Sequence, residues 1–187
     1  MSKVIDVVKL VGRCLGYDMM VDDIEADATL TASDEKNKKD IITAINHTVS
    51  EIAISLIPFV AVKTVTVSGG KFNLSRLPER IFRVLALWQN GVDIQHEVKG
   101  ENLYALDGTY ELEYRFVPAT LTENDDLPFF PYPVEKLVAY GSAIEACLVT
   151  GRISEAWNWH RAYEIERECA LKNHPPKSKK IKARAWA

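Results

Sequence analysis

Apolar residues recur at helical spacing in the first part of the chain. Val4, Val7, Val8, Val11 and Leu15 share one helical face and Gly16 suits a helix end, so the pattern predicts a helix over residues 3–16. The acidic stretch at residues 22–27 is expected to form a loop. A second helix is predicted over residues 33–57, with Ser33 as its N-cap and Pro58 as its stop. Its apolar seam consists of Ile41, Ile45, Val49, Ile52 and Leu56.

The hydrophobic period changes near residue 60, where residues rich in Val and Thr favour extended strands. Three turn signals follow at Gly69-Gly70, Asn90-Gly91 and Asp107-Gly108, and each is of a kind that joins antiparallel strands. In residues 110–116 apolar and aromatic side chains alternate with charged ones, as a half-buried strand requires. The pattern predicts a small antiparallel hairpin pair or meander over residues 60–117.

Helical spacing returns near the C-terminus, where helices are predicted over residues 133–150 and 153–172. The element order predicts an α+β fold. In this fold a four-helix bundle carries the antiparallel β insertion between its second and third helices, and the insertion projects from one end. Residues 1–173 form the single predicted domain, and residues 174–187 form an extended basic C-terminal arm.

Charge divides the chain into an acidic body and a basic end. The 187 residues carry a net charge of −3, but residues 1–171 hold 17 basic and 26 acidic side chains, a net of −9. From Lys172 onward there are six basic residues and no acid. An acidic body repels a phosphate backbone, so contact with an anionic partner is expected in the basic end.

The sequence contains no signal that places the protein outside a cytoplasm. Its N-terminus lacks the features of a signal peptide, and no stretch of about 18 uncharged apolar residues is present to span a membrane. Cys14, Cys147 and Cys169 are odd in number and widely spaced, so they are expected to be free thiols rather than a disulfide or zinc framework. A cytoplasmic protein is therefore predicted.

Residues that could carry chemistry are few and scattered. His47 and Glu51 lie four apart on a predicted helix, as do His160 and Glu164, and each pair is interpreted as a solvated surface pair. Cys147 stands among apolar neighbours, which make a thiol inert. An enzyme would need two or more of these five residues to meet in one pocket. We predict no enzyme activity, no metal and no cofactor.

Aromatic residues on the last predicted helix are candidates for contact with another subunit. Trp157 and Trp159 are two apart, so they point about 160° away from each other and cannot both bury against one face. With Tyr163 they form the predicted subunit-interface set, because Trp and Tyr are enriched at interfaces.

The C-terminal arm combines basic charge with spaced apolar residues. Its predicted partner-binding residues are Lys179, Lys180, Ile181, Lys182, Arg184 and Trp186. An extended segment of this kind can add to a sheet edge or lie in a partner's groove. A nucleic-acid arm and a solvated terminus are the other interpretations, since Trp186 could stack on a base while the lysines neutralise phosphates.

The element order resembles that of the bacteriophage head-to-tail adaptor (connector or neck) family, which includes the tail accessory factors and tubular adaptors of short-tailed phages. The most similar stretch is residues 131–167, PYPVEKLVAYGSAIEACLVTGRISEAWNWHRAYEIER, where two helices are joined at Thr150-Gly151-Arg152. The step Leu77-Pro78-Glu79-Arg80 and the strand end Tyr114-Arg115-Phe116 are also similar to that family.

The resemblance implies a structural virion protein that is assembled in the host cytoplasm. Such adaptors form a homo-oligomeric ring, commonly a dodecamer, which binds the portal protein through C-terminal segments and extends the DNA channel. DNA passes through without specific binding, no membrane is involved, and the β insertion faces the next tail or neck component. The alternative is a nucleic-acid-binding or DNA-packaging accessory protein that acts through the basic tail.

Overall fold

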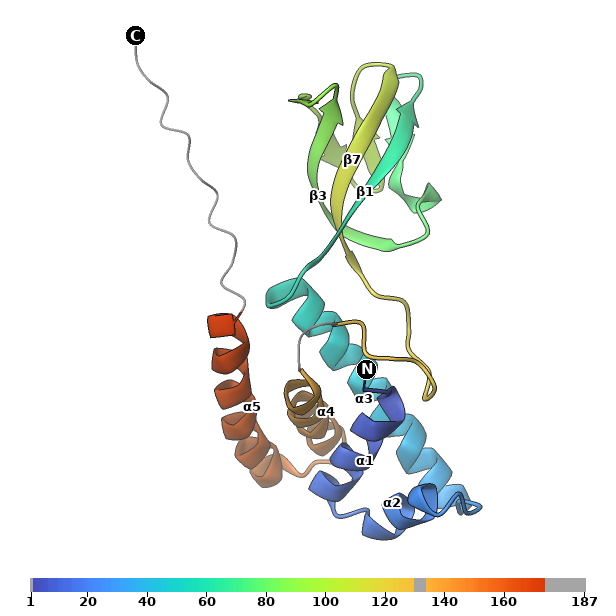
Figure 1. Ribbon diagram of the computed structural model, residues 1–187, viewed down its shortest axis with the longest axis vertical. Helices are drawn as coiled ribbons and strands as arrows, with labels where there is room; N and C mark the ends of the chain where they lie inside the picture. Colours follow the sequence, from blue (N-terminus) through green and yellow to red (C-terminus); the bar gives the residue numbers. More distant parts are fainter. Residues whose placement is uncertain (1, 130–133, 174–187) are drawn as a thin grey trace.

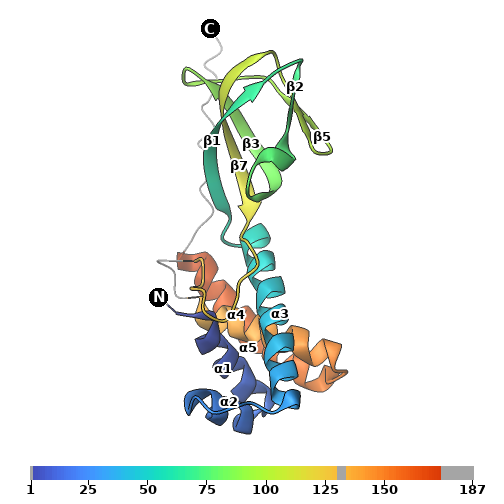
Figure 2. The same ribbon diagram turned by 90° about the vertical axis from the view of Figure 1, so that its right-hand side faces the viewer.

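In the computed structural model, which describes residues 2–129 and 134–173, helices occupy one end of an elongated molecule and strands the other (Figures 1 and 2). The helices are α1 (Val4–Leu15), α2 (Asp18–Glu25), α3 (Ala32–Ser55), α4 (Glu135–Val149) and α5 (Ile153–Asn173). The strands are β1 (Phe59–Val67), β2 (Lys71–Asn73), β3 (Arg80–Gln89), β4 (Val92–Asp93), β5 (Glu97–Lys99), β6 (Asn102–Tyr104) and β7 (Gly108–Val117). A short 3₁₀ turn, η1 (Leu74–Arg76), follows β2.

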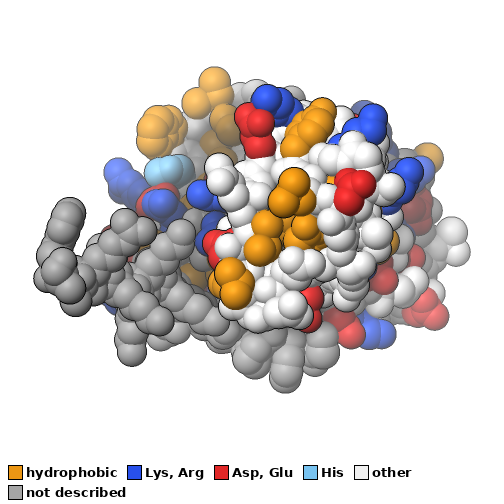
Figure 3. All heavy atoms as spheres, turned by 90° about the horizontal axis from the view of Figure 1, so that it is seen from above, with side chains coloured by type: hydrophobic (Ala, Val, Ile, Leu, Met, Phe, Trp, Pro, Cys, Tyr) orange, Lys and Arg blue, Asp and Glu red, His pale blue; other side chains and the backbone are white. Residues whose placement is uncertain are grey.

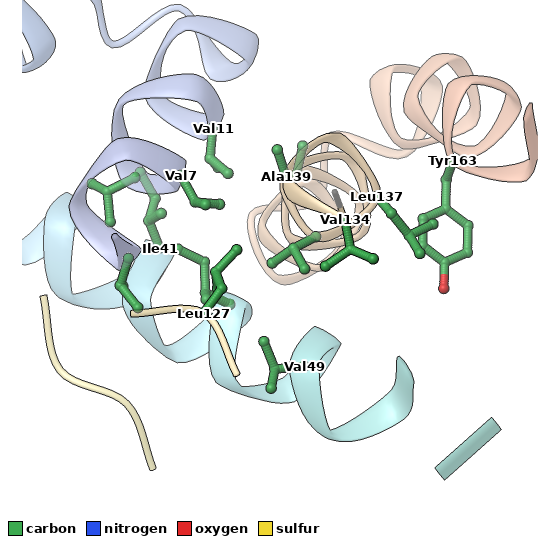
Figure 4. Close-up of a cluster of buried hydrophobic side chains, with 14 of the residues drawn as sticks. Val7, Val11, Ile41, Val49, Leu127, Val134, Leu137, Ala139 and Tyr163 are labelled. Atoms are coloured by element: carbon green, nitrogen blue, oxygen red, sulfur yellow. The ribbon is translucent and has the colours of Figure 1, made fainter. Parts of the chain in front are cut away.

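Helix α4 lies in the middle of the helical end, with α1 and α3 on one side and α5 on the other (Figures 1 and 4). Its residues Leu137, Val138 and Ala143 are buried, and they pack with the buried valine face of α1 and with Ile45 of α3. The same apolar periodicity that predicts these helices therefore supplies their contact faces.

The strands form two antiparallel sheets that enclose a second hydrophobic core. The four-stranded sheet has the order β1-β7-β3-β4, and the three-stranded sheet has the order β2-β6-β5. β1 is paired along its whole length with β7, from Phe59 opposite Phe116 to Val67 opposite Gly108. The apolar face of β7 is buried against side chains of both sheets, including Leu103 of β6. Two register shifts interrupt the pairing of β3 with β7.

A short neck connects the two ends of the molecule. The ring of Phe59 lies 5.3 Å from that of Phe129 in the helical core and 5.7 Å from that of Phe116 at the end of β7. Below these rings the chain that leaves the sheets is fixed to α3, because the side chain of Asn46 both accepts from the Leu121 amide (2.7 Å) and donates to its carbonyl (3.0 Å). Aromatic packing and a paired amide thus hold the neck.

The predicted fold class, a four-helix bundle with one hairpin or meander between its second and third helices, is wrong. The described chain has five helices and two antiparallel sheets, and the strands lie between α3 and α4. The additional helix is α2, which covers most of the acidic stretch that was expected to be a loop. It forms because Met20 and Val21 are buried against the helical core, while Asp18 stands in its first turn.

Local turn signals also mispredict part of the strand pairing. Asp107-Gly108 does not join two paired strands, because β6 pairs with β2 and β5 while β7 pairs with β1 and β3. The Asp107 carboxylate instead accepts from the Gly70 amide at 2.7 Å. The N-cap of α3 is Thr31 rather than Ser33, and its hydroxyl accepts from the Asp34 amide at 3.2 Å.

Candidate assembly surfaces

The three predicted interface residues occupy three different environments on α5. Trp157 is 66% exposed. Trp159 is partly buried and stacks on Tyr140 of α4, with ring centroids 5.8 Å apart. Tyr163 is only 8% exposed and belongs to the helical core, where burial raises its pKa to about 12 (Figure 4). Of the three, Trp157 is the one whose side chain is presented for contact with another molecule.

Trp157 is part of a longer row that sequence reasoning did not identify. Ile153, Trp157, Arg161 and Ile165 follow one another at four-residue spacing, and all four are exposed. They lie on the side of α5 turned away from the buried residues Ala156 and Tyr163, since each residue advances about 100° around a helix. We call these four residues the α5 outer face. The four-residue spacing in the sequence was the signal that could have revealed it.

The turn that leads into α5 is held in place by Arg152. Both terminal nitrogens of its guanidinium donate to the carbonyl of Leu15 at the end of α1, at 3.1 Å each. The same guanidinium forms an ion pair with Glu155, which keeps the pKa of that carboxyl below its usual value. Gly151, at φ +74°, supplies the left-handed residue that the turn needs. These contacts fix the start of α5, and with it the α5 outer face, relative to α1.

A pocket of about 190 Å³ opens on another side of the helical end. It lies where the end of α1, the first half of α3 and the end of α4 meet. Its apolar lining includes Leu15, Ile41, Ala44, Ala146 and Val149, and its polar lining includes Asp40, His47 and Glu145. We call it the α3–α4 pocket. The imidazole of His47 is 3.6 Å from the Glu145 carboxylate within it.

Exposed apolar side chains also gather at the far end of the sheets. Leu106, 81% exposed, follows β6, and Val92, 60% exposed, begins β4 just after the turn from β3. Seen from above, hydrophobic side chains stand in the centre of this end amid uncharged surface, with acidic and basic side chains around them (Figure 3). This arrangement suits contact with a protein rather than with a charged polymer.

A polar cluster stabilises the part of the sheets nearest the neck. The Glu79 carboxylate accepts from Lys63 of β1, at 2.8 and 3.1 Å, and from the hydroxyl of the fully buried Tyr114 of β7, at 2.8 Å. The bonds from Lys63 and then Tyr114 lower the pKa of Glu79. Burial and the Glu79 carboxylate raise the pKa of Tyr114. In the sequence, Glu79 is recognisable only as one residue of the step Leu77-Pro78-Glu79-Arg80.

Glu79→Gln is expected to lower the free energy of unfolding at pH 7 by about 1–2 kcal/mol, because the hydrogen bonds from Lys63 and Tyr114 lose their anionic acceptor. The folded-state pKa of Glu79 lies below its ordinary value of 4.5, so its contribution is complete above that value and is lost as pH falls through the folded pKa. Urea unfolding at pH 7 and at pH 3 measures both effects. The difference between the variant and the natural chain should shrink at pH 3.

Glu97→Gln is the matched control, because its partner Lys99 and Glu97 itself are both largely exposed. It is expected to change the free energy of unfolding by less than about 0.5 kcal/mol. Equal effects of the two variants at pH 7 would contradict the stabilising role of the Glu79 cluster.

The five residues considered for catalysis or metal binding do not meet in one place. His47 is beside Glu145 rather than Glu51, and His160 is 4.0 Å from Glu164 on the surface of α5. Cys147 is buried, and loss of solvent raises its pKa. Cys14 is partly buried and Cys169 is exposed, so the cysteines do not share one environment. Across the residues that the structure describes, no group of three His, Cys, Asp or Glu side chains is placed to hold a metal ion.

The predicted portal-docking residues Lys179, Lys180, Ile181, Lys182, Arg184 and Trp186 lie outside the described residues, so their role stays a prediction. In the two described ranges, every helix is too short or too polar to cross a lipid bilayer. Comparison of the chain with protein-family models and with curated proteins finds no match.

Proposed function

We propose that this chain is a structural virion protein, a ring-forming head-to-tail adaptor that binds a portal protein and extends its DNA channel toward the tail. The ring would contain about twelve copies, as the family resemblance implies. It would be assembled in the host cytoplasm and remain in the virion. The role requires contacts with other proteins and with further copies of the chain, and it requires no catalytic chemistry.

The observation that carries this proposal is the α5 outer face. Ile153, Trp157 and Ile165 are each at least 60% exposed and lie on one side of a 21-residue helix. A Trp flanked by aliphatic residues is a typical anchor of a protein interface, and its exposure does not stabilise the folded monomer. A face of this kind supports a protein that functions in an assembly.

The division of the molecule into two ends gives further support. An adaptor must contact one partner on each side, and here helices and sheets present different surfaces at opposite ends (Figure 1). The apolar group at the far end of the sheets suits the next tail or neck component. The described residues include all 26 acidic side chains but only 18 of the 23 basic ones. Such an excess of acid would let DNA pass without being gripped.

Mixing the chain with the portal ring of its own particle tests the proposal. The mass of the complex is measured for the full-length chain and for a chain truncated before Lys177. We expect the full-length chain to add a ring of copies to the portal, and the truncated chain to bind at least about tenfold more weakly, because the truncation removes five basic residues. A full-length chain that never associates with the portal would refute the adaptor proposal.

DNA binding discriminates the alternative role. If the basic tail acts on nucleic acid, binding of duplex DNA should fall steeply with salt and disappear on the same truncation. An adaptor should instead show portal binding and no strong DNA affinity at physiological salt.

A further inference from the structure

The α5 outer face and the α3–α4 pocket belong to different sides of the helical end. Helix α4 separates α5 from the pair α1 and α3 (Figure 4), and the outer face is on the side of α5 turned away from α4. The pocket opens beyond α4, between α3 and the end of α4. A contact between two unlike surfaces on one chain repeats from copy to copy and closes into a ring when the rotation permits.

The two surfaces are complementary in shape and polarity. The outer face is convex and presents the indole of Trp157 between Ile153 and Ile165. The pocket is concave, and the larger part of its lining is apolar. A large aromatic side chain inserted into a desolvated pocket is the usual centre of a stable protein interface.

Their charges are complementary as well. Arg161 lies one helical turn beyond Trp157 and is exposed. The neighbouring Glu164 carboxylate is contacted by Arg167 at 3.0 Å and by the His160 ring at 4.0 Å. The pocket carries the carboxylates of Asp40 and Glu145. A cation beside the inserted ring would therefore meet two anions at the pocket.

We propose that the α5 outer face of one copy docks into the α3–α4 pocket of the next copy, with Trp157 in the pocket and Arg161 opposite Asp40 and Glu145. This inference rests on the proposed ring-forming function and specifies which surfaces of neighbouring subunits meet. Opposite charges at such a contact fix its register and exclude wrong pairings.

A charge-reversal experiment with the full-length chain tests the docking. Arg161→Glu places an anion opposite the acidic pocket, and the double variant Asp40→Lys, Glu145→Lys places two cations opposite Arg161. Each protein alone is expected to lose at least about tenfold in the yield of the multi-copy complex on the portal ring, because like charges are then juxtaposed. Native mass spectrometry or mass photometry counts the copies.

An equal mixture of the two variant proteins should assemble again. In the mixture the reversed, acidic outer face of one protein meets a basic pocket, and the unchanged Arg161 of the other meets an acidic pocket. The two proteins therefore alternate around the ring, and its copy number is even. Recovery in the mixture also shows that both variants are folded. Arg76→Glu, which reverses an exposed arginine at η1 that belongs to neither surface, is the matched control and should assemble like the natural chain.

The outcomes separate this inference from the proposed function. The docking is wrong and the adaptor role stands if the natural chain forms rings and each variant protein alone forms them equally well. The same conclusion follows if the natural chain forms rings but the mixture of the two variants does not. If the natural chain forms no multi-copy complex with the portal, the adaptor role fails and the docking fails with it. If the mixture of the two variants forms only two-copy complexes, the proposed contact is supported but the assembly is a dimer and not a ring.

Discussion

Replacing Leu112 with alanine is expected to lower the free energy of unfolding by about 2–5 kcal/mol, the range for truncating a fully buried leucine. Leu112 has no exposed surface. It lies in the middle of β7, opposite Lys63 of β1 and Leu87 of β3, and belongs to the core between the two sheets. That core is small, so nearby side chains have little freedom to fill the cavity.

Urea or thermal unfolding followed by circular dichroism measures this effect. Val62→Ala is the matched control, because Val62 lies on the adjacent strand β1 but is 57% exposed. It is expected to change the free energy of unfolding by no more than about 0.5 kcal/mol. A Leu112 variant as stable as the Val62 variant would mean that the two sheets do not enclose a packed core.

Gly141→Ala is expected to destabilise the helical end by about 1–3 kcal/mol, although alanine is the better helix former by up to about 1 kcal/mol. A Cβ atom at Gly141 would lie 2.5 Å from the γ-methyl of Thr48 on α3 and 3.1 Å from the ring of Tyr163 on α5. The first contact is shorter than Cβ atoms make and the second is tighter than most, so Thr48 would have to shift and Tyr163 would have to move by a few tenths of an ångström.

Thr48→Ser is expected to rescue the Gly141 variant in part. Serine removes the methyl that would clash but keeps the hydroxyl that accepts from Ser142 at 3.3 Å. A double-mutant cycle of unfolding free energies should give a favourable coupling of about 1 kcal/mol. If the two substitutions are simply additive, the close approach of α3 and α4 at this point is not the cause of the destabilisation.

The long helices could be predicted from the sequence because each has an apolar stripe of its own. The first helix was predicted over residues 3–16 and runs from Val4 to Leu15. Helix α2 could not be predicted in this way, since two buried residues in eight, Met20 and Val21, are too few to show a period. Its many carboxylates favoured a loop, while its stability depends on packing against elements elsewhere in the chain.

Among strands joined by a short turn, the pair at Asn90-Gly91 was predicted, whereas the hairpin of β5 and β6 and the long-range pairs were missed. Asn90-Gly91 joins β3 to β4, with Gln89 opposite Val92. By contrast, β1 pairs with β7, whose residues lie more than 40 positions later. Turn signals report only on neighbouring residues, whereas burial of the alternating face decides which distant strands meet.

The candidate surfaces show the same limit. A difference in exposure between Trp157 and Trp159 follows from their spacing on a helix. Which of the two is exposed, and the burial of Tyr163, depend on where α4 lies. The α3–α4 pocket could not be predicted, because its lining comes from three segments that are far apart in the sequence. The basic arm remains a prediction from sequence alone.

Because β1 pairs with β7, the length of the β end can change without any change in the helical end. The chain leaves the helical end at Phe59 and returns at Phe116, and these two residues are partners in the sheet. Adding paired residues to both strands would move the distal tip outward by ~3.4 Å per residue. The helices, the α5 outer face and the α3–α4 pocket would stay as they are. In the proposed ring, the reach toward the tail and the diameter of the channel could therefore evolve independently.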